Sequence, residues 1–308
     1  MERTLQDVGK AAVIGLGSMG WGAALSLLRV GFVVNGCDVR QDVLQRFSQA
    51  GGKSCKTPSE AASTADTVFV FVVNSSQTED VLFGPGGALE TARAGTVFLL
   101  CATMAPSATV AIADRLETAG MLVVDAPVSG GHAKALSGEM VVMGSGSPEA
   151  FARAKQALDA VSGKVFRLGD RPGPGSQVKM INQLLAGVHI AVTAEAMTFA
   201  AKTGIDLKTL YDVLRVSAGS SWMFENRGEH IVSGDYAPRS AVDIFVKDLG
   251  IVTSEADRAG AVTPLAATAL DLFRQASNAG LGLEDDAAVA KILAEKSGVV
   301  LPGMTVMG

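Results

Sequence analysis

Ala11-Ala12-Val13-Ile14-Gly15-Leu16-Gly17-Ser18-Met19-Gly20 decides the fold of the N-terminal half. Ala11–Leu16 predicts a short buried strand, and the apolar spacing of Gly20–Val30 predicts a helix directly after it. A GxGxxG pattern in this position is typical of a dinucleotide-binding turn, because its glycines permit a tight turn, close approach to the pyrophosphate and close helix packing. The alternative is a purely structural turn. The sequence favours cofactor binding, by Gly15, Leu16, Gly17, Ser18, Met19 and Gly20.

An acidic residue follows the second predicted strand, Phe32–Cys37. Asp38 is placed to accept hydrogen bonds from the hydroxyls of the adenosine ribose and to repel a 2′-phosphate. Asp38 therefore favours NAD as the cofactor, with NADP as the lesser alternative. Arg40, two residues later, leaves two interpretations open: a solvated side chain, or a group that contacts the adenine or a phosphate.

Strands and helices alternate from the glycine turn to about residue 173. Thr67–Val73 is almost continuously apolar, as expected of a strand in a parallel sheet covered on both faces. Further strands are predicted at Val97–Leu100, Met121–Asp125, Glu139–Gly144 and Lys164–Arg167, with helices at Ser107–Ala119 and Pro148–Val161. The alternation predicts a Rossmann-like, doubly wound α/β domain over residues 1–173.

The pattern changes after the Pro/Gly-rich stretch Gly169–Gly175. A long helix is predicted over Ser176–Thr203, and strand-like alternation almost disappears beyond it. Residues 174–308 are therefore expected to form an all-α domain. The long helix is more apolar than one small domain requires, which favours a homodimer or homotetramer.

Composition excludes several classes of protein. The net charge is −5 without a dense Lys/Arg run, so the footprint of a nucleic-acid-binding protein is missing. The longest apolar stretches, Val68–Val73 and Val97–Ala102, are too short to span a bilayer. The first ten residues carry no apolar run, so we expect no signal peptide. The three cysteines are spaced too widely for a metal or redox motif. We expect a cytoplasmic protein that binds no metal, nucleic acid or membrane.

Polar residues gather on one stripe of the long predicted helix. At about 100° per residue, Lys179, Asn182 and Gln183 share a face of an otherwise apolar helix, which suggests a lined cleft. The alternative is a solvated face with an ordinary lysine. Lys247 has a similar ambiguity, because an ion pair with Asp243 four residues earlier would explain it.

Two other candidates follow predicted strands. Ser129-Gly130-Gly131 could direct backbone N–H groups and a hydroxyl at a small anion, although an ordinary strand-to-helix turn has the same composition. Thr103 follows Val97–Cys101, at the strand edge where open α/β sheets bind ligands.

Four separated blocks of the chain resemble the β-hydroxyacid dehydrogenase family, which includes 3-hydroxyisobutyrate dehydrogenase and tartronate semialdehyde reductase. The blocks are Gly15–Gly20, Asp125–Ala135 with Gly138, Gly173–Asn182, and Phe245–Leu249. Their order, over nearly the whole chain, is more specific than any one block. The resemblance implies NAD-dependent oxidation of a small hydroxy acid. Another acid of the family, with NADP, and a dinucleotide-binding module without catalysis are the alternatives.

The resemblance also implies roles for individual residues. Lys179 would be the catalytic base and Asn182 its neighbour in the substrate site; burial beside the nicotinamide would lower a lysine pKa from ~10.4 toward ~7–8. Gln183 replaces a family asparagine and would shape the substrate pocket. The remaining implied contacts are to the substrate carboxylate for Ser129, Gly130 and Gly131, and to the cofactor for Asn74, Thr103 and Lys247.

Overall fold

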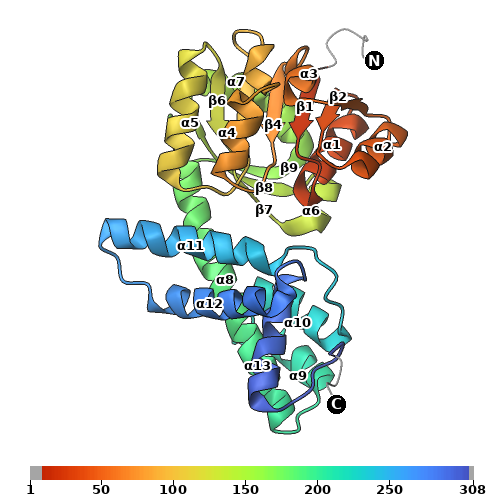
Figure 1. The fold of residues 1–308 in the computed structure, drawn as a ribbon, viewed down its shortest axis with the longest axis vertical. Coiled ribbons are helices and arrows are strands. Elements are labelled where there is room, and N and C mark those ends of the chain that lie inside the picture. The colour runs from red at the N-terminus through yellow and green to blue at the C-terminus, as the bar shows by residue number, and fades with distance from the viewer. Residues whose placement is uncertain (1–8, 305–308) are drawn as a thin grey trace. The chain divides into compact units, whose positions relative to one another are not determined.

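The computed structural model describes residues 9–304 and divides the chain into two compact units (Figure 1). Unit 1 runs to Lys179 and unit 2 begins at Met180. The division falls within helix α8 (Pro174–Lys202), shortly after the Pro/Gly-rich stretch at which the sequence predicts the domain boundary.

Unit 1 is built on one twisted sheet. Strands β1 to β6 run parallel in the spatial order β3-β2-β1-β4-β5-β6, and β8 continues the sheet antiparallel to β6. Strand β8 also pairs with β7 and, in parallel, with β9. The strands are β1 (Lys10–Ile14), β2 (Val33–Cys37), β3 (Lys53–Cys55), β4 (Thr67–Val70), β5 (Val97–Leu100), β6 (Leu122–Asp125), β7 (Val128–Ser129), β8 (Met140–Gly146) and β9 (Ser162–Arg167).

Helices cover both faces of this sheet, so alternate residues of each central strand enter opposite cores. In β1, Val13 packs into one core and Ile14 into the other, and both are buried. The first core holds α1 (Ser18–Arg29), α2 (Gln41–Gln49), α6 (Gly131–Ser137) and α7 (Pro148–Val161); the second holds α3 (Pro58–Ala62), α4 (Ser75–Phe83), the short η1 (Ala88–Glu90) and α5 (Pro106–Thr118). The predicted Rossmann-like fold is confirmed.

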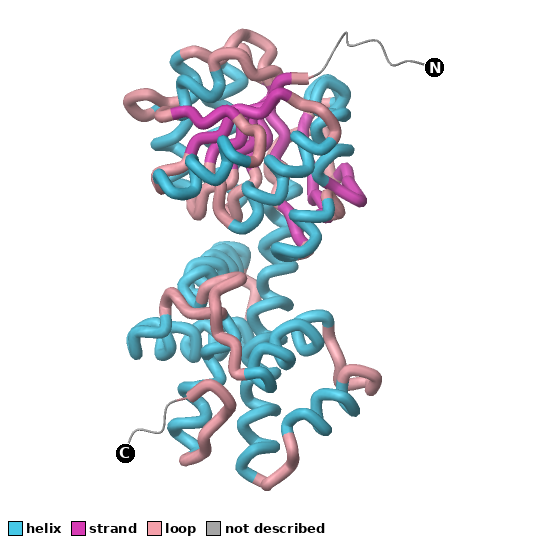
Figure 2. Tube along the Cα trace, turned by 90° about the vertical axis from the view of Figure 1, so that its right-hand side faces the viewer, coloured by secondary structure: helices cyan, strands magenta, loops and turns pink. Residues whose placement is uncertain are grey.

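Unit 2 consists of helices and loops in its described residues, as Figure 2 shows, apart from an isolated bridge between Ala241 and Asp285. The Phe245 and Phe273 rings stack in its core with centroids 5.3 Å apart. Its helices after α8 are α9 (Leu207–Leu214), α10 (Trp222–Ser233), α11 (Val242–Ala259), α12 (Pro264–Ala276) and α13 (Val289–Ser297), with shorter helical turns η2 (Ser277–Leu281) and η3 (Asp286–Ala288). The predicted helical domain is confirmed.

Helix α8 is long and apolar enough, by length and composition, to cross a membrane, and among residues 9–304 it is the one helix of this kind. Its residues Ile190, Ala194 and Met197 are buried in the core of unit 2. One side of this helix therefore packs into the core of unit 2.

Candidate active site

The glycine turn joins β1 to α1 and has the geometry of a phosphate cradle. Gly15 has φ +89°, and a Cβ there would lie 2.6 Å from the backbone oxygen of Phe71. A Cβ on Gly17 would meet nothing within 4 Å, and no side chain caps the N-terminus of α1 at this residue. Gly20 packs directly on the Gly15 carbonyl. An open backbone at a helix N-terminus fits the pyrophosphate of a dinucleotide.

Asp38 connects the end of β2 to the glycine turn. Its Oδ2 accepts the backbone N–H of Leu16 at 2.8 Å, and Arg40 donates through Nε to Oδ1 at 2.9 Å. Burial alone would raise the pKa of Asp38, but the hydrogen bonds from Arg40 and Leu16 outweigh it and lower the pKa. Arg40 forms an ion pair with Asp38, and 52% of its side chain is exposed, so a largely solvated side chain agrees with the structure.

Asn74 and Thr103 follow the next two strands at the same edge of the sheet. Asn74 caps α4: its Oδ1 accepts the Gln77 N–H at 2.8 Å, and the Gln77 side chain accepts the Val73 N–H in return. Thr103 lies in the loop between β5 and α5. Because β2, β1, β4 and β5 are parallel neighbours, Asp38, the glycine turn, Asn74 and Thr103 all follow the carboxyl ends of the strands.

The Ser129-Gly130-Gly131 turn lies beside the glycine turn. Ser129 ends β7, and α6 starts at Gly131. His132 places its Nδ1 3.2 Å from the Ser18 hydroxyl, which brings the start of α6 to the start of α1. Further along, Ser26 of α1 donates to the Ala135 carbonyl of α6. The two turns are therefore held in a fixed relation by the packing of α1 against α6.

Lys179 is buried, with 8% of its surface exposed, and follows the first turn of α8. That turn is anchored by Asp125 at the end of β6. Asp125 accepts hydrogen bonds from the backbone N–H groups of Gly173 (3.0 Å) and Ser176 (2.8 Å), and from the hydroxyls of Ser176 (2.7 Å) and Ser145 (3.1 Å). The sequence analysis missed this anchor, although Asp125 stands at the head of one of the four blocks.

Replacing Asp125 with alanine is expected to lower the free energy of unfolding by at least ~2 kcal/mol, because several buried donors lose their acceptor. Burial raises the pKa of Asp125 above its ordinary value of 3.8, against the hydrogen bonds that lower it. The folded protein therefore binds the proton of the Asp125 carboxyl group more tightly than the unfolded chain does. The contribution of Asp125 to stability falls as pH rises through its pKa in the folded protein. In urea unfolding, Asp125→Ala should lose more free energy of unfolding relative to wild type at acidic pH than at neutral pH. Asp159→Asn, at an exposed ion pair, is the control; an equal deficit in both variants would contradict the anchor.

Three predicted site residues meet in unit 2 around an aspartate that the sequence analysis did not select. Asp248 accepts a hydrogen bond from Gln183 Nε2 at 2.5 Å, and Asn182 Nδ2 donates to Gln183 Oε1 at 3.0 Å. Lys247 Nζ lies 2.7 Å from Asp248 Oδ1, as an ion pair. Asp243, which the sequence suggests as a partner of Lys247, accepts a hydrogen bond from Ser277 at 2.6 Å.

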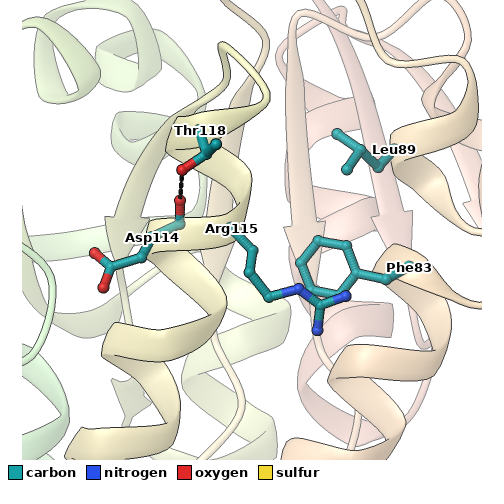
Figure 3. A pocket seen from close by; sticks show the side chains of 5 residues that line it. All are labelled: Phe83, Leu89, Asp114, Arg115 and Thr118. Carbon is teal, nitrogen blue, oxygen red and sulfur yellow. Dashed lines mark hydrogen bonds between the residues drawn. The ribbon is translucent and has the colours of Figure 1, made fainter.

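A hollow of about 350 Å³ elsewhere in unit 1 contains none of the predicted site residues (Figure 3). It is lined by Phe83, Leu89, Asp114, Arg115 and Thr118. These residues lie at the ends of α4 and α5 and in η1, away from the carboxyl ends of the strands at which both helices begin. Within residues 9–304, no group of three or more His, Cys, Asp or Glu residues is arranged to hold a metal ion.

Comparison with known proteins identifies the family. Residues 10–169 match the NAD-binding domain of 6-phosphogluconate dehydrogenase, and residues 173–293 match the NAD-binding domain of NADP-dependent 3-hydroxyisobutyrate dehydrogenase. The chain is 54% identical to the L-threonate dehydrogenase of Cupriavidus necator, over 94% of this chain and 97% of that protein. It is 33% identical to the 2-(hydroxymethyl)glutarate dehydrogenase of Eubacterium barkeri, over 96% and 98%.

A solved structure shows the same fold. The crystal structure of 3-hydroxyisobutyrate dehydrogenase from Salmonella typhimurium superposes with a TM-score of 0.89 at 48% identity, covering 92% of this chain and 99% of that one. Family models and relatives together extend over both units. The chain therefore belongs to the 3-hydroxyisobutyrate dehydrogenase family, and it is an NAD-dependent hydroxyacid dehydrogenase.

Proposed function

We propose that the chain oxidises L-threonate to 2-dehydro-L-erythronate with NAD. The observation that carries this proposal is identity of 49–54% to five proteins named L-threonate dehydrogenase, each matched over 94% of this chain. Three stretches of the sequence also resemble these enzymes: Val73–Gly84, Gln183–His189 and Ser221–Arg227.

In the proposed mechanism, Lys179 takes the proton of the substrate hydroxyl. The Ser129-Gly130-Gly131 turn binds the substrate carboxylate through its N–H groups and hydroxyl, so that one C–H is oriented for transfer. NAD, when bound, accepts the hydride. The glycine turn and Asp38 hold its pyrophosphate and ribose, and Asn74, Thr103 and Lys247 complete the cofactor contacts. Asn182 and Gln183 orient the substrate from α8. Buried Lys179 and the open backbone at Gly17 support this assignment.

A second candidate is the oxidation or reduction of another acid of the family, as in 3-hydroxyisobutyrate dehydrogenase or tartronate semialdehyde reductase. The name of the superposing Salmonella typhimurium structure supports it. The panel that separates the candidates measures NADH and NADPH formation from L-threonate, 3-hydroxyisobutyrate and glycerate. L-Threonate with NAD should give the highest kcat/KM. Good turnover of a three-carbon or branched acid without turnover of L-threonate would reject our first proposal.

Cofactor choice gives a second test, at Asp38. In Asp38→Asn the carboxylate that repels a 2′-phosphate is removed, while the amide oxygen can still accept the Leu16 N–H. Arg40 then loses its anionic partner and becomes available to a phosphate. We expect the ratio of kcat/KM for NADP to that for NAD to rise about tenfold or more, which is roughly 1.4 kcal/mol. Adding Arg40→Ala should abolish the gain, and an unchanged ratio in Asp38→Asn would contradict this role.

We also infer a homodimer or homotetramer that uses α8. Apolar side chains are exposed along one side of this helix at the seven-residue spacing of a helix–helix contact, at Val178, Leu185, Val192 and Phe199, with Ile181 on the same side. The three cysteines are free and buried, which supports a reducing cytoplasm as the location.

A further inference from the structure

Three polar side chains form a hydrogen-bonded chain inside unit 2. The chain runs from Asp248 on α11 to Gln183 on α8, and from Gln183 to Asn182. Asp248 is 2% exposed and Gln183 is 7% exposed, so water does not compete freely for these bonds. Gly187, one turn after Gln183, permits the approach of α11, because a Cβ there would lie 2.8 Å from a Leu249 methyl group.

The Asp248 carboxylate fixes the direction of both hydrogen bonds in this chain. An ionised carboxylate only accepts hydrogen bonds, so Gln183 must turn its NH2 group toward Asp248. The Gln183 carbonyl oxygen then faces Asn182, and Asn182 must donate to it through its own NH2 group. The Asn182 carbonyl oxygen is consequently directed away from Gln183. The Lys247 amine lies 2.7 Å from the other Asp248 oxygen, as an ion pair.

We propose that Asp248 is a positioning residue that sets the polarity of Gln183 and Asn182, so that Asn182 presents an acceptor on the face of α8 that carries Lys179. Asn182 follows Lys179 by three residues, and side chains at this spacing are neighbours on a helix. An acceptor there can accept an N–H of Lys179, which an NH2 group cannot do. This inference rests on the proposed function of Lys179.

The test is a swap of acid and amide along the chain. Asp248→Asn lets Gln183 adopt either orientation, so kcat should fall severalfold. Asn182→Asp places an oxygen against the Gln183 carbonyl and should lower kcat about tenfold. In the double variant, the amide introduced at position 248 donates to Gln183, and Gln183 donates to the carboxylate introduced at position 182. That carboxylate still presents an oxygen beside Lys179, so kcat should recover to within about threefold of wild type, a coupling that independent sites do not show.

Two controls separate this role from a simple change of charge. Asp257→Asn removes an exposed charge from the same helix and should leave kcat unchanged. Each variant is measured across its pH profile, because Asn182→Asp adds a charge next to Lys179. A double variant no better than the product of the single effects, or an Asp248→Asn variant equal to Asp257→Asn, would overturn the proposal.

A measurement on the free protein keeps the inference testable without activity. The side-chain NH2 groups of Gln183 and Asn182, assigned by NMR, should exchange slowly with water in the wild type. In Asp248→Asn both should exchange faster, including that of Asn182, which Asp248 does not contact. Unchanged exchange at Asn182 would reject the relay even if a swap variant fails to fold. If Lys179→Ala keeps activity, the role proposed for Lys179 fails while the exchange data still decide the role of Asp248.

Discussion

Lys179→Ala is expected to lower kcat by about 10²–10⁴-fold, the contribution typical of general acid–base catalysis, while the Kd for NAD changes little. Lys179 is buried near the start of α8, whose first turn is anchored through Asp125, so its amine has a defined position. The proposed cofactor contacts are made by other residues. Single-turnover kinetics would measure the chemical step. Quenching of the protein's own fluorescence during titration with NAD would measure binding.

Lys179→Arg separates the charge of this residue from its proton transfer. Arginine keeps the positive charge but does not release a proton at accessible pH, so this variant should be as inactive as the alanine variant. The matched control is Lys202→Ala, at the other end of the same helix, where the exposed amine donates to the Ser297 carbonyl. More than about a tenth of wild-type kcat in Lys179→Ala would show that another group takes the proton, since even weak general bases contribute ~10²-fold.

The parts of this molecule that could be predicted from sequence depend on neighbours along the chain. The strand at Ala11–Ile14 is apolar at every position because both faces of the sheet are covered, and the glycine spacing after it reflects backbone constraints within six residues. The helices of unit 2 could be predicted for the same reason, because the periodic spacing of apolar residues is a local pattern.

Asp125 and Asp248 were missed because their partners are distant in sequence. Asp125 binds groups 48 and 51 residues away, and Asp248 binds one that is 65 residues away. Each carboxylate exchanges water for hydrogen-bond donors that come together only in the folded protein. A local sequence pattern therefore does not predict these bonds. Lys247 has a neighbour that its spacing from Asp243 does not indicate, because the structure places its amine 2.7 Å from Asp248.

Unit 2 contains a buried ionic cluster for which we expect a large loss of stability on mutation. Arg227, 8% exposed, forms a two-point contact with the Asp286 carboxylate, in which Nη2 lies 2.9 Å from Oδ2. Asp285 lies 3.9 Å from the same guanidinium and 2.9 Å from the ring of His230. Both aspartates are fully buried. Burial raises the pKa of Asp286 to about 6, although Arg227 pulls it downward.

Removal of Arg227 leaves two adjacent buried carboxylates without their shared cation. Breaking such a pair from one side costs about 3–5 kcal/mol, a large part of the ~5–15 kcal/mol that stabilises a typical domain. Arg227→Ala should therefore lower the free energy of unfolding by this amount. Arg227→Met, which fills most of the space, should be nearly as damaging, because the loss comes from unpaired charge rather than from a cavity.

Urea unfolding followed by circular dichroism measures both losses. Arg258→Ala is the control, since Arg258 pairs with Glu255 on the surface of α11 with 66% of its side chain exposed; exposed pairs contribute about 0–1 kcal/mol. Adding Asp286→Asn to Arg227→Met should recover part of the stability by removing one of the stranded charges. If the Arg227 variants lose no more than Arg258→Ala, the aspartates must be neutral or rehydrated in the folded protein, and the cluster then contributes packing rather than charge pairing to the helical unit.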